Sequence, residues 1–438
     1  MSLTNHMWSG FNLLANVGVW QALPRDVQVV IEGTAASFVR RQRSDTDVLN
    51  RDLAERLAGR GMILRWTWRA SGAGSARSTR DGGRSSAPAR GACSKPRSGR
   101  WAREAGMEYR ALGGTGLRVS ALGFGCGNVG GLMIRGSAAE RERAVARAVE
   151  LGVNYFDTAP LYGDGQSERN LGAALKTLRV PVYVGTKVRL DAADMKDVRG
   201  AIGRSLDASL GRLGLPHVDL LQLHNNIVGE RGTGPVSVGA LIGEVIPALQ
   251  ALQSQGKTRF WGITALGDTG ALHRVLDAAS LHTAQVCYNL LNPSAGVEVP
   301  SGFPAQDFRR LLEHARERRV GVVVIRVLAA GALSGVTARH PVAVPTVDPI
   351  ATGPDYGSDV ERAQALRALV TEGQVATLVE ASLRFALSHE AVSTVLLGYS
   401  SLEHLEYAAT AVAKGPLPAA ALARLSTVWA GFGRGAEA

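Results

Sequence analysis

The stretch VNYFDTAPLYG, residues 153–163, has the pattern of a buried strand that ends in an open loop. It begins with an apolar and aromatic run, which Gly152 precedes and Pro160 follows. Asp157 stands where the strand is expected to end, and Tyr162 lies five residues later. A carboxylate and a phenol at the mouth of a strand form a proton-transfer pair if a cation joins them.

Two later strands supply further polar groups at their carboxyl ends. The run VYVGTKV (182–188) ends with Lys187, and VDLLQLHN (218–225) ends with His224. In a barrel of parallel strands, all carboxyl ends open onto one face, and catalytic groups from different strands collect there. Each residue also has a structural interpretation: the carboxylate can cap a turn, the ammonium can be solvated and the imidazole can be a packing residue.

These four residues, within FDTA-x-x-Y, GTK and QLHN, resemble the catalytic tetrad of the aldo-keto reductases. The resemblance runs from about Met107 to Leu425. It implies an NAD(P)-dependent oxidoreductase that acts on CH–OH groups, with Tyr162 as general acid and base. Lys187 would favour the phenolate, Asp157 would keep that lysine charged and oriented, and His224 would donate to the substrate oxygen.

Alternating strand and helix patterns after Met107 predict a (β/α)8 TIM barrel. A hairpin at 108–120 is expected to cover its amino-terminal end, and segment 335–360 is expected to form a lid over the mouth. The Gly-rich run 123–131 lacks the GxGxxG spacing of a doubly wound sheet. The expected strands are 119–124, 153–158, 182–187, 218–224, 259–264, 284–289, 321–327 and 392–397. Expected helices include 138–150, 196–213, 240–255, 269–279 and 307–318.

Cofactor-binding residues follow from the same resemblance. Thr264 and Gln285 match positions that hold the nicotinamide carboxamide, and Ile325 stands where an aromatic residue often stacks on the ring. Around the phosphates and the adenosine we expect Arg326, Leu328, Gly331, Gly398 and Ser400. Arg326 can equally meet a carboxylate at the barrel end. The first turn after Ser400 has Ser401 and His404 where NADP-preferring members carry Lys or Arg, which favours NAD and leaves NADP open.

The substrate is expected to be a small carbonyl compound or a sugar. HNNIVGERG (224–232) and IRVLAAGALSG (325–335) resemble the branch that contains pyridoxal dehydrogenase and the sugar 1-dehydrogenases, which act on sugars such as L-fucose or L-galactose. Asn225 and Asn226 would suit a polyhydroxylated substrate, or they only close a turn. A hypothesis of another class is a cofactor-binding regulatory subunit with little turnover.

The amino-terminal quarter differs in character from the rest. Residues 1–64 predict a helical fragment that resembles the carboxyl-terminal region of TRAP-transporter periplasmic solute receptors. Residues 65–106 are rich in Arg, Gly and Ser and nearly without aliphatic side chains, which predicts a disordered linker. A basic arm for nucleic acid is the alternative. The barrel domain is assigned to residues 107–438.

Charge and cysteine content exclude several functional classes. Of the net charge of +11, residues 1–106 hold 17 Lys and Arg against 8 Asp and Glu, leaving 32 against 30 for the rest. The basic balance therefore does not indicate a nucleic-acid partner for the barrel. Three scattered cysteines indicate neither a disulfide framework nor a metal site. With no apolar run of about 20 residues and no secretory pattern, we expect a cytoplasmic protein without membrane spans. The oligomeric state is left open.

Overall fold

The computed structural model describes Gln28, residues 106–230 and residues 236–432. The helical fragment expected at 1–64 and the linker expected at 65–106 therefore lie almost wholly outside the described residues.

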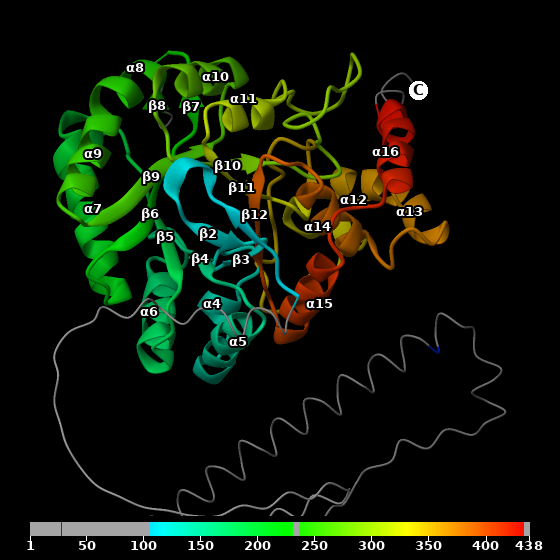
Figure 1. The fold of residues 1–438 in the computed structure, drawn as a ribbon, viewed down its shortest axis with the longest axis horizontal. Coiled ribbons are helices and arrows are strands. Elements are labelled where there is room, and N and C mark those ends of the chain that lie inside the picture. The colour runs from blue at the N-terminus through cyan, green and yellow to red at the C-terminus, as the bar shows by residue number, and fades with distance from the viewer. Residues whose placement is uncertain (1–27, 29–105, 231–235, 433–438) are drawn as a thin grey trace, which may run out of the picture. The chain divides into compact units, whose positions relative to one another are not determined.

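Eight parallel strands close into a barrel in which each strand pairs with its neighbours in chain order (Figure 1). The last strand pairs with the first, so the sheet has no free edge. The (β/α)8 barrel predicted from the sequence is confirmed. The strands are β3 (Leu122–Gly125), β4 (Tyr155–Asp157), β5 (Tyr183–Val188), β6 (Val218–Leu223), β9 (Thr258–Ala265), β10 (Thr283–Cys287), β11 (Gly321–Ile325) and β12 (Val392–Gly398).

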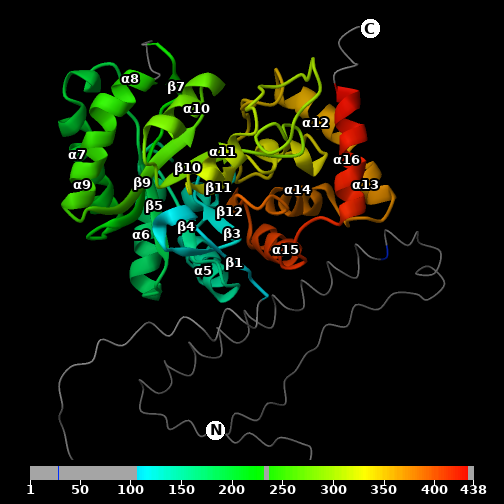
Figure 2. The same cartoon turned by 45° about the horizontal axis from the view of Figure 1, so that its top comes forward.

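Helices lie outside the strands and cover the barrel (Figures 1 and 2). Their ends follow from local sequence. At α5, the hydroxyl of Ser137 accepts from the backbone N–H of Glu140, whose side chain accepts in return from the Ser137 N–H. The helices that follow the strands are α5 (Ala138–Glu150), α6 (Gln166–Leu178), α7 (Val198–Leu213), α9 (Ile246–Ser254), α10 (Thr269–Ala278), α11 (Leu311–Glu317), α14 (Leu378–Leu387) and α15 (Leu402–Ala413).

Further elements lie in the loops, in the hairpin turn and at the carboxyl-terminal end. Two short strands, β7 (Ile227–Val228) and β8 (Val236–Ser237), pair in parallel after β6. The remaining helices are α4 (Leu132–Arg135), α8 (Val238–Ala240), α12 (Tyr356–Ala365), α13 (Ala368–Thr371) and α16 (Ala419–Phe432), with short helical turns η1 (Gly113–Thr115), η2 (Asp194–Lys196), η3 (Leu241–Val245) and η4 (Ala329–Ser334).

A hairpin covers the amino-terminal end of the barrel, as the sequence predicted. Its strands β1 (Tyr109–Ala111) and β2 (Arg118–Ser120) pair antiparallel. The turn between them packs so closely on the start of β11 that a Cβ at Gly113 would stand 2.2 Å from the backbone nitrogen of Gly321. Apolar side chains of the hairpin enter the barrel and form a small cluster with strand residues: Leu112, Leu117, Val119, Tyr155, Leu220 and Val323.

Most expected elements differ from the structure by one or two residues at their ends, and three differ more. The run 119–124 is divided, because its first residues belong to the hairpin strand β2 and the barrel strand begins at Leu122. The helix expected at 240–255 contains the π-helical turn η3 ahead of α9. The helix expected at 307–318 begins only at Leu311, because Arg309 and Arg310 have left-handed backbone angles of φ 49° and 57°.

The segment expected as a lid, 335–360, crosses the loops at the carboxyl ends of several strands. The guanidinium of Arg135, after β3, donates to Val342 O at 2.6 Å. Arg326, after β11, donates to Asp348 O at 3.1 Å. The segment therefore connects the loop after β3 with the loop after β11.

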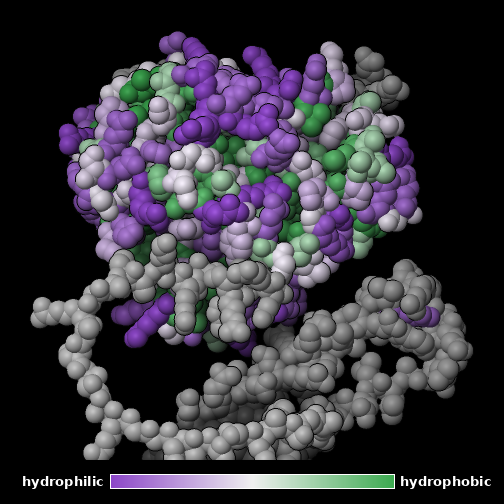
Figure 3. All heavy atoms as spheres, in the orientation of Figure 1, coloured by the Kyte–Doolittle hydropathy of each residue, from purple (hydrophilic) through white to green (hydrophobic). Residues whose placement is uncertain are grey.

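The surface of the barrel that Figure 3 shows is mainly hydrophilic, with hydrophobic residues in small groups. In the part of the chain that the structure describes, no helix combines the length and the apolar character that a membrane span requires.

Candidate functional site

Asp157 and Tyr162 lie at the carboxyl-terminal end of β4 and in the loop after it. Asp157 is the last residue of the strand and is 1% exposed. The loop turns back at once, because the backbone N–H of Gly165 donates to Pro160 O at 2.7 Å. This turn brings the phenol of Tyr162 back over the strand end.

Lys187 joins these two residues. It projects from β5, is 2% exposed, and forms a buried ion pair with Oδ1 of Asp157. Its ammonium also donates to Thr158 O at 2.9 Å and to the hydroxyl of Tyr162 at 3.2 Å. Burial alone would lower the pKa of Lys187, but the charge of Asp157 and the hydrogen bonds raise it above its usual value. The ammonium is therefore charged and fully hydrogen-bonded.

His224 follows β6 and faces the phenol. The rings of His224 and Tyr162 meet edge to face with centroids 5.9 Å apart. Burial, with the charges of Lys187 and Arg189, lowers the pKa of His224 to about 3. The imidazole is therefore neutral at pH 7, and its buried Nδ1 has no hydrogen-bond partner among the described residues. The structure thus brings together the four residues that the sequence singled out.

Two neutral donors complete the surroundings of Asp157. Its second oxygen, Oδ2, accepts from the hydroxyl of Tyr155 at 2.9 Å and from Nε2 of Gln285 at 2.8 Å. Sequence reasoning missed Tyr155, although its position two residues before Asp157 on a strand places both side chains on one face.

Thr264 and Gln285, expected at the nicotinamide, are paired neighbours on β9 and β10. The hydroxyl of Thr264 is buried and has no partner among the described residues. The amide nitrogen of Gln285 is already used by Asp157. At the carboxyl ends of these strands, the hydroxyl of Thr264 is therefore available to a ligand. The neighbouring Gln285 connects this position to the carboxylate of Asp157.

The loop after β11 contains three of the expected cofactor residues. Arg326 is half-buried with φ 56°, and burial lowers the pKa of its guanidinium. The backbone oxygen of Leu328 accepts from the N–H of Gly331, whose φ is 111°. These left-handed angles turn the chain sharply at the strand end, and Ile325 lies just before the turn at the end of β11.

The loops after β12 and β3 lie against one another. The hydroxyl of Ser400 donates to Gly130 O at 2.7 Å. A Cβ at Gly130 would come within 2.5 Å of the carbonyl carbon of Gly398, so the contact requires glycine. Ser401 caps α15 by accepting from the backbone N–H of His404. Gly398 is exposed and therefore accessible to a ligand.

Asn225 and Asn226, expected at the substrate, have different surroundings. The amide of Asn225 bonds twice to the backbone of Leu190, accepting from its N–H at 2.9 Å and donating to its oxygen at 2.7 Å. This geometry favours the turn-closing interpretation of Asn225. Asn226 is exposed, and its backbone oxygen accepts from the N–H of Val236.

Two further residues near the tetrad were not singled out from the sequence. Cys126 follows β3 and is 1% exposed, and burial together with Asp157 raises the pKa of its thiol. Arg189 is exposed, two residues after Lys187, and its charge reaches His224. Strand-end position was the available signal for both residues.

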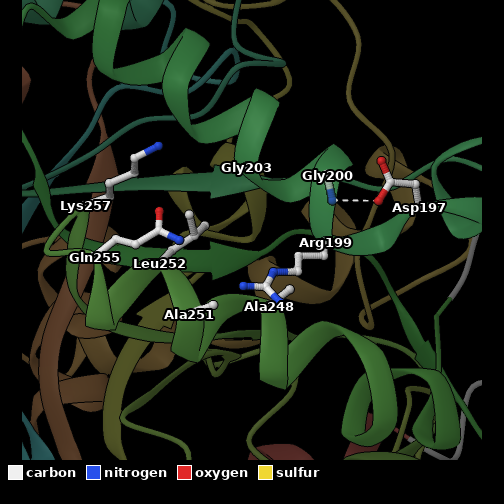
Figure 4. A pocket seen from close by; sticks show the side chains of 9 residues that line it. All are labelled: Asp197, Arg199, Gly200, Gly203, Ala248, Ala251, Leu252, Gln255 and Lys257. Carbon is white, nitrogen blue, oxygen red and sulfur yellow. Dashed lines mark hydrogen bonds between the residues drawn. The ribbon is translucent and has the colours of Figure 1, made fainter.

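A separate hollow lies between α7 and α9, away from these strand ends (Figure 4). Asp197 at its edge accepts from the backbone N–H of Gly200 and caps α7. Lys257, at the other end, is paired with Asp207 at 2.6 Å. Asp197 and Lys257 therefore have structural partners. The proton-transfer groups described above gather at the barrel mouth instead.

Comparisons with known proteins give two family matches. A model of the aldo/keto reductase family matches residues 121–430, and a model of bacterial extracellular solute-binding protein, family 7, matches residues 1–67. The second match agrees with the resemblance predicted for residues 1–64.

Individual relatives resemble the larger part of the chain. L-Galactose dehydrogenase of Arabidopsis thaliana is 33% identical over 317 residues, which is 70% of this chain and 88% of that protein. D-threo-Aldose 1-dehydrogenase of a Pseudomonas species is 31% identical over 251 residues, 51% of this chain and 70% of that protein. The holo structure of an aldo-keto reductase from Bacillus halodurans has a TM-score of 0.57 and 27% identity, covering 74% of this chain and 96% of that one.

Proposed function

The chain belongs to the aldo/keto reductase family, and from that premise we propose that it interconverts a carbonyl or lactol and its partner by hydride transfer, with Tyr162 as general acid and base. The observation that carries the proposal is the buried ammonium of Lys187, which holds the carboxylate of Asp157 on one side and the phenol of Tyr162 at 3.2 Å on the other.

In the reductive direction, the hydroxyl of Tyr162 gives its proton to the substrate oxygen. The ammonium of Lys187 stabilises the phenolate that remains, because the two groups are hydrogen-bonded in a buried site. In the oxidative direction the phenolate takes the proton back. Asp157 keeps the ammonium charged and in place.

His224 orients the substrate oxygen and is not the acid. Because its pKa is lowered to about 3, the imidazole is uncharged at pH 7. A neutral imidazole still donates one hydrogen bond, which suffices to fix a carbonyl beside the phenol.

The strand ends fit a nicotinamide dinucleotide. The buried hydroxyl of Thr264, which has no partner in the described part of the chain, suits a carboxamide. The left-handed turn at Arg326 and the open backbone of Gly398 suit phosphate groups. Leu328, Gly331 and Ser400 would line the same path. When bound, this group supplies or accepts the hydride.

We infer a preference for NAD over NADP from the start of α15. Its first turn carries Ser401 and His404 in place of Lys or Arg. Burial of its ring, with the charge of His340, lowers the pKa of His404, so this residue is a weaker cation for a 2′-phosphate than Lys or Arg.

An aldose is the substrate class that the relatives favour. L-Galactose dehydrogenase and D-threo-aldose 1-dehydrogenase are named for sugar oxidation. The exposed Asn226 beside His224 is a candidate partner for sugar hydroxyls.

The test is a screen of L-galactose, L-fucose and small aldehydes with NAD and NADP, using the full chain and the Tyr162→Phe variant. We expect sugar oxidation with a lower KM for NAD, and a loss of kcat of at least about 100-fold in Tyr162→Phe. Cofactor binding, measured by fluorescence titration, should be retained. Unchanged turnover in the variant would reject the role of Tyr162. Cofactor binding without turnover by the unaltered chain would favour a regulatory subunit.

A further inference from the structure

The buried phenol of Tyr155 is a group that the proposed mechanism does not use. Its hydroxyl and Nε2 of Gln285 both donate to Oδ2 of Asp157, whereas Oδ1 of that carboxylate pairs with Lys187. The two carboxylate oxygens therefore have separate partners: neutral donors hold one, and the ammonium meets the other.

The neighbouring strands leave room for this phenol. A Cβ at Gly185, on β5, would lie 2.8 Å from the hydroxyl of Tyr155 and 3.2 Å from Oδ2 of Asp157. A Cβ at Gly123, on β3, would lie 3.2 Å from the Tyr155 ring. Because the residues that face Tyr155 on these two strands are glycines, the fully buried tyrosine fits inside the barrel beside the ion pair.

A buried ion pair is stable only when its remaining lone pairs are also satisfied. Hydrogen bonds from neutral donors to a carboxylate are strong, and they also restrict rotation of the carboxylate about its side chain. Here the restriction has a direction, because fixing Oδ2 leaves Oδ1 facing Lys187.

We propose that Tyr155 is a positioning residue for the reaction: its hydroxyl, together with Gln285, fixes Asp157 so that the ammonium of Lys187 is held against Tyr162. This inference rests on the proposed function for the roles of Lys187 and Tyr162. The phenol of Tyr155 touches neither substrate nor cofactor in this role.

The variant Tyr155→Phe keeps the ring and removes the hydroxyl. We expect kcat to fall about tenfold, with little change in the KM for the cofactor, because one hydrogen bond to a buried charge is lost. In the oxidative direction, the alkaline limb of the kcat–pH profile reports the loss of the charge on Lys187. This limb should move to lower pH, because the raised pKa of Lys187 depends on Asp157. The matched control is Tyr109→Phe in the hairpin, which removes a 2.7 Å hydrogen bond to the backbone oxygen of Gly152 and should leave kcat and the pH profile unchanged.

A second variant reaches the same hydroxyl from the other side. Gly185→Ala displaces the hydroxyl of Tyr155 without removing it, so we expect the same shift of the alkaline limb. In the cofactor-free protein, Gly185→Ala should lower Tm, and in the Tyr155→Phe background that loss should be at least halved, because the nearest atom that the new methyl group meets is gone. A Cβ at Gly123 meets the ring, which Tyr155→Phe keeps, so the loss of Tm caused by Gly123→Ala should be the same in both backgrounds.

These outcomes separate the two proposals. Absence of turnover by the unaltered chain in the sugar and aldehyde screen rejects the proposed function. An active parent with an unchanged kcat and pH profile in Tyr155→Phe overturns the role of Tyr155 alone. Additive losses of Tm for Tyr155→Phe and Gly185→Ala overturn it as well.

Discussion

Lys187 shows how a buried cation can be both stable and useful. Its three N–H groups meet Asp157, the backbone oxygen of Thr158 and the phenol of Tyr162. An unpaired ammonium in this place would lose its proton, whereas the carboxylate keeps it charged. Burial, together with the charge of Lys187, lowers the pKa of the adjacent His224, so the cation helps to keep this imidazole neutral.

Because His224 is buried as a neutral imidazole, the free energy of unfolding should decrease as the pH falls. Its folded-state pKa of about 3 lies below the ordinary 6.5, so between these two pH values the unfolded chain binds a proton at His224 and the folded chain does not. The stability is fully present above pH 6.5 and is lost as pH falls toward 3. Between pH 6.5 and 5, His224 alone should account for about 2 kcal/mol of lost unfolding free energy.

Denaturant titrations of the cofactor-free protein at pH 6.5 and 5 measure this difference. His224→Gln should reduce the acid loss by about that amount. His217→Gln, at an exposed histidine before β6, is the control and should reproduce the parent. An equal acid loss in parent and His224→Gln would contradict the neutral burial of this imidazole.

The tetrad could be predicted from the sequence because each member lies at the carboxyl end of a strand or in the loop after one. The partners of Asp157 could not. Tyr155 reads as part of an apolar strand, and only the register of β4, β5 and β10 shows that its hydroxyl and the amide of Gln285 converge on one oxygen. Asn225 shows the opposite case, because a polar residue beside a catalytic one is used to hold the backbone.

Among the elements, the contact between the loops after β3 and β12 shapes one side of the mouth. Gly130 lies against the backbone of Gly398 and Tyr399, and a Cβ there would come within 2.4 Å of the Tyr399 nitrogen. Gly130→Ala should therefore push the two loops apart. We expect Tm to fall by about 4 °C or more and the Kd for the cofactor to rise.

Gly211→Ala is the matched control for this substitution. Gly211 lies in α7, and a Cβ there would meet nothing within 4 Å. Because alanine favours helix over glycine by about 1 kcal/mol, this variant should be slightly more stable than the parent. A Tm for Gly130→Ala that equals the parent value would show that the two loops can separate freely.

Alternation of strands and helices was enough to predict the barrel, but not the ends of its elements. The run 119–124 appears as one strand in the sequence, and only pairing with Tyr109–Ala111 assigns its start to the hairpin. The π-helical turn Leu241–Val245 has an ordinary helical pattern, since one extra residue in a turn changes the period too little to be seen.

At the scale of the whole molecule, the barrel is complete without the amino-terminal residues. The hairpin begins at Tyr109, and the eight strands close on themselves by Gly398. Met107 is 7% exposed and lies beside Gly152 within the barrel unit. The excess positive charge belongs to residues 1–106, whereas the rest is nearly balanced.

We therefore expect a chain of residues 107–438 to fold and to match the full chain in kcat and KM within about twofold, because every residue assigned to the site lies after Met107. Its pI should fall toward neutrality, and weak binding of the full chain to a polyanion such as heparin should be lost. Steady-state kinetics, thermal unfolding and heparin retention at low salt measure the three properties. Starting instead at residue 122 would remove the hairpin, exposing Leu220 and Val323 at the barrel floor, and is the control expected to lose stability. A shortened chain from Met107 that folds but turns over substrate far more slowly would show that residues 1–106 take part in the reaction.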